Sequence, residues 1–203
     1  MVYRATDHTR ARKAERRQAI LSAAREVVAR GDFARLRISD VARDAGVATG
    51  TVYRYFPNKV ELSLEVFRLV SGIELAFLEQ LSAEPSEPIP RFKTLLRAFV
   101  LRALERPRLA YALLAEPLPE AVAAERLRYR REFAKVFARL IEEGIATGDL
   151  PPQDAALSAT WLVGALSEAL YGPLIQSSQR ERLLPTLTAL ALQSIGIRPG
   201  GTL

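Results

Sequence analysis

The chain has 203 residues and a net charge of +6, and its 49% hydrophobic and 26% charged residues exclude a disordered protein. It contains no cysteine, which excludes disulfides and thiolate metal sites. Its single histidine leaves little for zinc binding or for histidine base chemistry. No apolar run approaches the roughly 18 residues of a membrane span, so we expect a soluble, cytoplasmic protein without a cofactor.

The positive charge is concentrated in the first part of the chain. Residues 1–60 hold 13 of the 29 basic residues but only 6 of the 23 acidic ones, whereas the remainder is close to neutral. A basic segment attached to a near-neutral body is typical of a small module that faces a polyanion such as nucleic acid. A merely arginine-rich surface is the alternative, but it does not explain the asymmetry.

Three helical segments are predicted in this basic part. Apolar residues recur at helical spacing from Arg10 to Arg30, and Gly31 is suited to end that helix. Two short segments follow, Ile38 to Ala45 and Thr49 to Tyr55, and Gly46 separates them. Glycine permits the backbone of a tight turn. The pair therefore has the pattern of a helix-turn-helix, whose second helix enters the major groove of DNA.

The second short helix carries many side chains that reach outward. Hydroxyl groups suited to phosphate oxygens are found on Thr49, Thr51, Tyr53 and Tyr55. Arg54 is long enough to reach a guanine edge or another phosphate. Lys59 lies at the start of the next helix, where backbone amides already favour an anion. Phe56, by contrast, is expected in the core.

The rest of the chain is also predicted to be helical. Asn58 can cap a helix that runs to about Leu81, and Glu61, three residues later, can complete a capping box. Prolines and glycines separate the further segments, which are Arg91–Leu104, Pro107–Leu114, Glu120–Ala146, Asp154–Leu170 and Arg180–Ile195. No segment alternates for long with the period of a strand. We therefore predict an all-α fold.

The segment ISDVARDAGVATGTVYRYFPNKVELSLEVF, from Ile38 to Phe67, resembles the DNA-binding signature of the tetracycline-repressor (TetR) family of bacterial transcription regulators. The resemblance implies a helix-turn-helix DNA-binding domain in residues 1–57. It also implies a long fourth helix that leads into a helical effector-binding and dimerisation domain in residues 58–203. The protein is then expected to be a homodimer that binds an operator in double-stranded DNA.

The resemblance assigns DNA contacts to positions of this segment. Those expected at phosphates are Thr51, Tyr53, Tyr55 and Lys59, and those expected near bases are Thr49 and Arg54. Two positions depart from the family pattern. Arg37 stands where a serine or threonine usually caps the first short helix, and Ala48 stands where a serine often caps the second. Arg37 is expected to contact phosphate through its side chain, while the cap is lost unless Ser39 or Asp40 replaces it.

The last two predicted helices are candidates for a dimer interface. They are rich in small and apolar residues, and the resemblance implies a four-helix interface at this end of the chain. The expected interface residues are Ala159, Val163, Leu166, Leu183, Leu187 and Leu190. The alternative is that both helices complete the core of a single chain.

Two charged residues fall on apolar helix faces in the second part of the chain. Arg126 lies in an apolar stripe of the segment Glu120–Ala146, and Glu168 lies on a face of the next segment. A charge on an apolar face is costly unless it is paired. Either the two form a structural bridge, or they orient a ligand in a pocket lined by Tyr111, Tyr129, Phe133 and Trp161.

The leading functional hypothesis is a ligand-responsive transcriptional repressor, which a small, mostly apolar effector releases from palindromic DNA. A helix of about 24 residues from Asn58 spans about 36 Å and is the expected lever between effector and DNA. A DNA-binding regulator without a ligand switch is the first alternative. A helical enzyme with an incidental helix-turn-helix is the second. It is disfavoured because the chain lacks cysteine, an internal histidine and a glycine-rich nucleotide motif.

Overall fold

The computed structural model describes residues 7–175 and 180–197, and the regular structure in these residues is entirely helical. The helices are α1 (Asp7–Arg30), α2 (Ile38–Asp44), α3 (Thr49–Tyr55), α4 (Lys59–Ser82), α5 (Pro88–Glu105), α6 (Pro107–Leu114), α7 (Glu120–Thr147), α8 (Ala155–Ile175) and α9 (Arg180–Ser194). The predicted all-α fold is therefore confirmed. Within the described ranges, no helix is long and apolar enough to cross a membrane.

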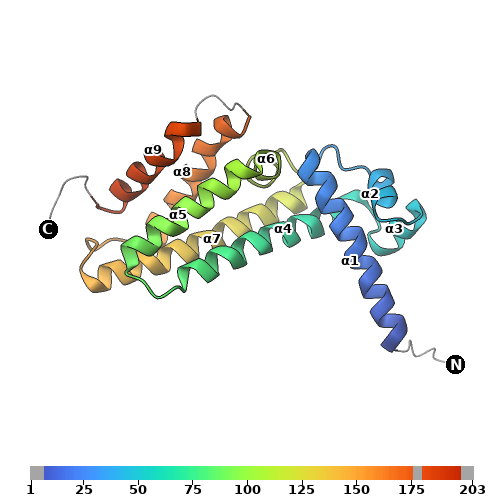
Figure 1. Cartoon of the computed structure of the whole chain (residues 1–203), viewed down its shortest axis with the longest axis horizontal. Helices are drawn as coiled ribbons and strands as arrows, with labels where there is room; N and C mark the ends of the chain where they lie inside the picture. Colours follow the sequence, from blue (N-terminus) through green and yellow to red (C-terminus); the bar gives the residue numbers. More distant parts are fainter. Residues whose placement is uncertain (1–6, 176–179, 198–203) are drawn as a thin grey trace.

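The helices form a small head and a long body. Figure 1 shows α1, α2 and α3 gathered at one end of the molecule, with α4 and α7 running side by side away from them. The helices α5 and α8 also pack on α7, and α9 packs on α5 and α8. The short helix α6 contacts both α1 and α8, so it lies where the head meets the body.

The head has an apolar core that continues into the body. Ile20 of α1, Val41 of α2 and Val52 of α3 are completely buried. The same cluster includes Leu62 near the start of α4 and Ala112 of α6. The head is therefore packed directly on the body, and a movement of α4 or α6 bears on the head core.

A second core fills the body between its long helices. The rings of Phe92 in α5 and Phe137 in α7 meet edge to face, with centroids 5.6 Å apart, an arrangement that aromatic pairs favour. Leu162 and Leu170 of α8 are buried in the same cluster. Gly148, with a φ of +85°, ends α7 in a left-handed conformation that suits glycine.

The start of α4 follows the predicted cap with one difference. The side-chain oxygen of Asn58 accepts a hydrogen bond from the amide of Glu61 at 2.9 Å. In a capping box the glutamate would accept from the backbone amide of the cap residue. Here the Glu61 carboxylate accepts instead from the side-chain amide of Asn58 at 3.1 Å.

The helix α8 is longer than the sequence predicted. It continues beyond Leu170 to Ile175, although Pro173 lies inside it. A proline removes one backbone hydrogen bond, but only the last residues of the helix follow this one. Leu170 and Leu174 are both buried, and their packing favours continuation of the helix.

Candidate functional site

The helix-turn-helix predicted from the sequence is present in α2 and α3. Gly46 has a φ of +64°, a left-handed conformation that residues with a Cβ rarely adopt. The amide of Val47 donates to the carbonyl of Ala42 at 2.9 Å, which closes the turn. Val41 and Val52 are completely buried, so α3 is held firmly against α2.

The residues of α3 divide between an inner and an outer face. Val52 and Phe56, the residue after the helix, are buried, and Phe56 is therefore a core residue as predicted. Tyr53, with 48% of its surface exposed, is one of few large aromatic side chains among the described residues that are open to solvent. On this outer face Thr49, Tyr53 and Arg54 are exposed, and Thr51 and Tyr55 are half-buried.

The starts of α2 and α3 lack side-chain caps. Arg37 and Ala48 occupy the two cap positions, and neither accepts a hydrogen bond through its side chain. At the start of α2, one carboxylate oxygen of Asp40 accepts from Arg43 at 3.0 Å. Arg37 is exposed and forms no ion pair within the described part of the chain.

Lys59 is held beside the loop that joins α1 to α2. Its Nζ donates to the carbonyl oxygen of Ala34 at 2.9 Å, at an exposed site. An ammonium group has three donors, so two remain for another acceptor such as a phosphate oxygen. The bond fixes the position of this charge next to the helix-turn-helix.

The same loop is bound from the other side by Glu116, in the segment between α6 and α7. The carboxylate of Glu116 accepts hydrogen bonds from the amides of Phe33 and Ala34, at 3.0 and 2.7 Å. Glu116 is only 4% exposed, although a glutamate is seldom buried without such partners. No sequence pattern marked this residue, because glutamates are mostly exposed.

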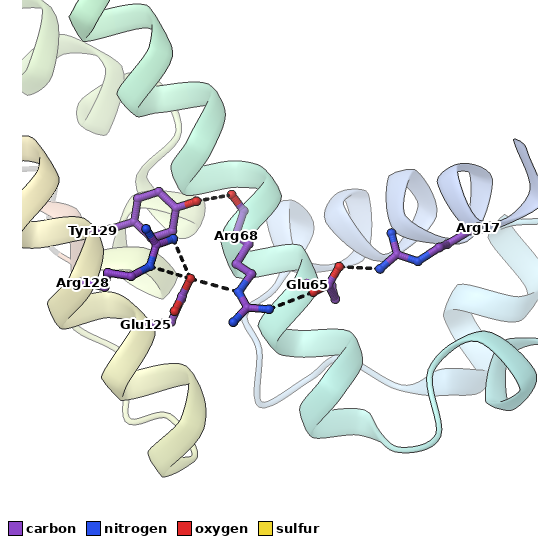
Figure 2. Close-up of polar contacts among 6 residues, drawn as sticks. All are labelled: Arg17, Glu65, Arg68, Glu125, Arg128 and Tyr129. Atoms are coloured by element: carbon purple, nitrogen blue, oxygen red, sulfur yellow. Dashed lines mark hydrogen bonds and ion pairs between the residues drawn. The ribbon is translucent and has the colours of Figure 1, made fainter. Parts of the chain in front are cut away.

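A chain of ion pairs connects the head, α4 and α7, as Figure 2 shows. Arg17 of α1 pairs with Glu65 of α4, and Arg68 of α4 bonds Glu65 at 3.1 Å and Glu125 of α7 at 3.0 Å. Arg128 also donates to Glu125, at 2.7 Å. The sequence did not predict this network, whose members come from three helices.

The network shifts the protonation of its carboxyl groups. The hydrogen bond from Arg17, with a further bond from Arg68, holds the pKa of Glu65 below its usual range. The bonds from Arg128 and Arg68 likewise lower the pKa of Glu125. Both glutamates are therefore charged at neutral pH, and the contacts between the three helices depend on that charge.

A cavity of about 80 Å³ lies between the helices of the body. Residues of α4, α5, α6, α7 and α8 line it, and most of its wall is apolar. Of the residues predicted to line a pocket, Arg126, Tyr129 and Phe133 of α7 do so. The Tyr129 hydroxyl also donates to the carbonyl of Arg68 in α4 at 3.0 Å (Figure 2).

The other predicted pocket residues lie elsewhere, which corrects the sequence-based assignment. Trp161 is 55% exposed on α8, and Glu168 is also exposed on that helix. Tyr111 is half-buried outside the cavity, with its ring 6.0 Å from that of Tyr171. The proposed bridge between Arg126 and Glu168 does not form. Arg126 donates instead to the carbonyls of Glu116 and Ala112, at 2.6 and 3.3 Å.

The expected interface residues on α8 are also corrected. Ala159, Val163 and Leu166 are buried in the core of their own chain, as is Leu187 of α9. Leu183 is half-buried and packs on the same core, whereas Leu190 is exposed. Among the described residues of these two helices, the large hydrophobic side chains that are exposed are Leu157, Trp161, Tyr171 and Leu190.

A helix-turn-helix that presents hydroxyl and cationic side chains at one end of a helical body defines a DNA-binding transcription regulator. Residues 20–66 match the model of bacterial regulatory proteins of the TetR family, and residues 85–170 match a tetracycline-repressor-like C-terminal domain. The transcriptional repressor KstR of Rhodococcus jostii is 30% identical over 73% of this chain and 70% of its own length. The chain belongs to the TetR family, as its sequence signature indicated.

Other relatives and solved structures agree with this classification. The KstR repressor of Mycolicibacterium smegmatis is 30% identical over 75% of this chain and 76% of the relative. The regulator FadR of Bacillus subtilis, solved in complex with stearoyl-CoA, has a TM-score of 0.72 at 21% identity. That comparison covers 89% of this chain and 99% of the other, and it shows that the two share a fold.

Proposed function

We propose that this regulator is a repressor that binds a palindromic operator as a homodimer and is released by a small, mostly apolar effector. The arrangement of α4 carries the proposal. Its first residue, Lys59, lies beside the helix-turn-helix, and further along the same helix Phe67, Ser71 and Leu78 line the cavity. A ligand that moves this wall therefore acts on the helix that positions the head.

In the operator complex, α3 lies in the major groove and contacts both phosphates and bases. The residues that bind phosphates are Thr51, Tyr53, Tyr55 and Lys59, with Arg37 at the start of α2. The residues that face bases are Thr49 and Arg54. The exposure of this face of α3 supports the assignment, as does the exposed side chain of Arg37, which forms no ion pair with the described residues.

The dimer forms through α8 and α9. One short helix reads only a few base pairs, and a two-fold pair places two such helices in successive major grooves, about 34–36 Å apart. Four of the eight large hydrophobic residues exposed in the described part of the chain lie on α8 and α9. They are Leu157, Trp161, Tyr171 and Leu190, and a second copy of the chain would cover them.

The effector occupies a widened form of the cavity. The present volume of about 80 Å³ is close to half the roughly 150 Å³ of an engineered cavity that binds benzene. A larger apolar ligand therefore has to move the helices around it. Such a ligand releases DNA because it binds the widened, DNA-incompetent arrangement more tightly than the present one.

The relatives support both the proposed repression and the proposed apolar effector. The KstR proteins are named as repressors. The Bacillus subtilis FadR structure contains stearoyl-CoA, whose acyl chain is apolar. A mostly apolar effector is therefore compatible with the fold and with the wall of the cavity.

Selection of fragments from the source genome by the purified protein tests the proposal. The selected site should be palindromic, and fluorescence anisotropy should show that apolar compounds weaken binding to it. Arg54→Ala should reduce the preference for this site, whereas Arg131→Ala, at an exposed position of α7, should not. If no apolar compound changes DNA binding, the protein is a regulator without a ligand switch.

A further inference from the structure

We infer that the effector carries a negative charge and that Arg126 and Arg130 of α7 bind its anionic group. The inference rests on the proposed effector cavity and adds the chemical class of the ligand. That class is an amphipathic anion, with an apolar body and an oxyanion such as a carboxylate at one end.

Both arginines are held on one side only. Nη2 of Arg126 donates to the carbonyls of Ala112 and Glu116, and Nη2 of Arg130 donates to the carbonyl of Leu114 at 3.0 Å. The carbonyls of Ala112 and Leu114 belong to the last turn of α6, where a cation is favoured, and that of Glu116 lies just after the helix. The Nε atoms of both arginines are buried and have no hydrogen-bond partner in the described residues. Both side chains line the cavity.

This arrangement is incomplete without an anion. A buried donor that lacks an acceptor raises the free energy of the folded state. Burial, followed by the positive charge of Arg130, lowers the pKa of Arg126, yet an arginine side chain remains charged at neutral pH. An oxyanion between the two guanidinium groups would accept from the unpaired donors and remove the repulsion between the charges.

The other residues that line the cavity determine which chemical groups the rest of the ligand can carry. Apolar side chains, including Phe99, Leu113 and Phe133, line the same cavity as the two arginines. The glutamate among the lining residues does not neutralise them, because Glu74 is paired with Arg102 at 2.9 Å. The cavity therefore has an excess of positive charge at one place and an apolar surface elsewhere. A neutral or cationic ligand of the same size leaves this charge unmatched.

Three small probes with the same number of carbon atoms test whether the site prefers an anionic, a neutral or a cationic ligand. They are octanoate, octan-1-ol and octylammonium. Affinity is measured from the rise of the melting temperature of the full chain with ligand concentration, and from the loss of operator binding. Octanoate should bind about 10- to 100-fold more tightly than octan-1-ol, the range expected for a hydrogen bond to a charged group. Octylammonium should bind most weakly.

Variants then locate the anionic group. Arg126→Gln combined with Arg130→Gln should abolish the preference for octanoate, whereas Arg131→Gln combined with Arg139→Gln, at exposed positions of the same helix, should keep it. Because Arg126 and Arg130 also hold α6, the single changes Arg126→Lys and Arg130→Lys provide a second test. They keep the charge but remove the Nε donor, so octanoate should bind more weakly while octan-1-ol is unaffected.

The outcomes distinguish the anion site from the cavity itself. Equal binding of octanoate and octan-1-ol to the wild-type protein would overturn the inference and leave the effector cavity in place. A preference for octanoate that persists in the glutamine variant would show that the anion binds elsewhere. If none of the three probes binds, the effector cavity is refuted, and the proposed switch with it.

Discussion

Glu116→Gln should loosen the contact between the head and the body. The buried Glu116 carboxylate accepts hydrogen bonds from the amides of Phe33 and Ala34, at 3.0 and 2.7 Å. Glutamine has nearly the same size but offers one acceptor oxygen. Its NH₂ group would face the second amide, so that two donors meet and neither finds an acceptor.

The size of the effect follows from these two bonds. A hydrogen bond to a charged group contributes about 1.5–3 kcal/mol, and a buried donor without a partner costs about 1–3 kcal/mol. The loop between α1 and α2 can shift and admit water, which recovers part of the loss. We therefore expect the free energy of unfolding to fall by about 2–3 kcal/mol.

Urea unfolding and operator binding measure this change. The unfolding midpoint should fall while the slope of the transition stays the same. An effector should also weaken DNA binding by a smaller factor in Glu116→Gln than in the wild type, because one of the connections to the head is broken. The control is Glu142→Gln, since Glu142 is exposed on α7. A midpoint and an effector response equal to those of this control would refute the reasoning.

Three other changes test the DNA face, the dimer and the ion pairs. Lys59→Ala should weaken binding to all DNA sequences alike and lower the salt slope, measured by anisotropy, by about one unit. The Trp161→Glu variant should sediment as a monomer in sedimentation velocity yet keep its affinity for the effector, because Trp161 lies outside the cavity. A loss of effector affinity in this variant would show that Trp161 contributes to the effector site. The lowered pKa of Glu125 stabilises the fold above the ordinary value of about 4.3, and this contribution disappears as the pH falls through the folded-state pKa. Thermal unfolding of Glu125→Gln should therefore show a smaller loss of stability between about pH 5 and pH 3 than the wild type.

Local signals made most helix boundaries predictable. The first residues of α3 and α6 agree with the prediction, because Gly46 precedes α3 by a few residues and Pro107 is itself the first residue of α6. Asn58 caps α4 for the same reason. The extension of α8 through Pro173 was missed because it depends on packing of Leu174 in the body, and a local rule about proline does not include that packing.

The inward and outward faces of α8 could not be predicted in the same way. This helix is apolar on nearly every side, so the helical period does not tell which side faces the core. Ala159 and Val163, expected at the interface, are buried within their own chain, while Trp161, expected in the pocket, is turned to solvent. The same two helices remain the proposed interface, but through different residues.

The polar contacts at the site depend on backbone groups far away in the sequence. A bridge to the Glu168 carboxylate was one of the two alternatives for Arg126, but its partners are the carbonyl oxygens of Ala112, in α6, and of Glu116, just after that helix. Glu116 binds amides more than 80 residues earlier in the chain. Every residue has such carbonyl and amide groups, so the sequence carries no sign of which ones a side chain selects.

The contacts of Ala34 suggest how the effector and DNA sites communicate. Its amide donates to Glu116, on the body, and its carbonyl accepts from Lys59, which is proposed to bind a phosphate. The carbonyl of Glu116 in turn accepts from Arg126 in the wall of the cavity. If the proposed effector draws Arg126 toward its anionic group, we expect the hold of Glu116 on Ala34 to weaken and Lys59 to move with the loop. The coupling acts equally in both directions, so operator DNA should reduce the affinity for the effector by the same factor by which the effector reduces the affinity for DNA.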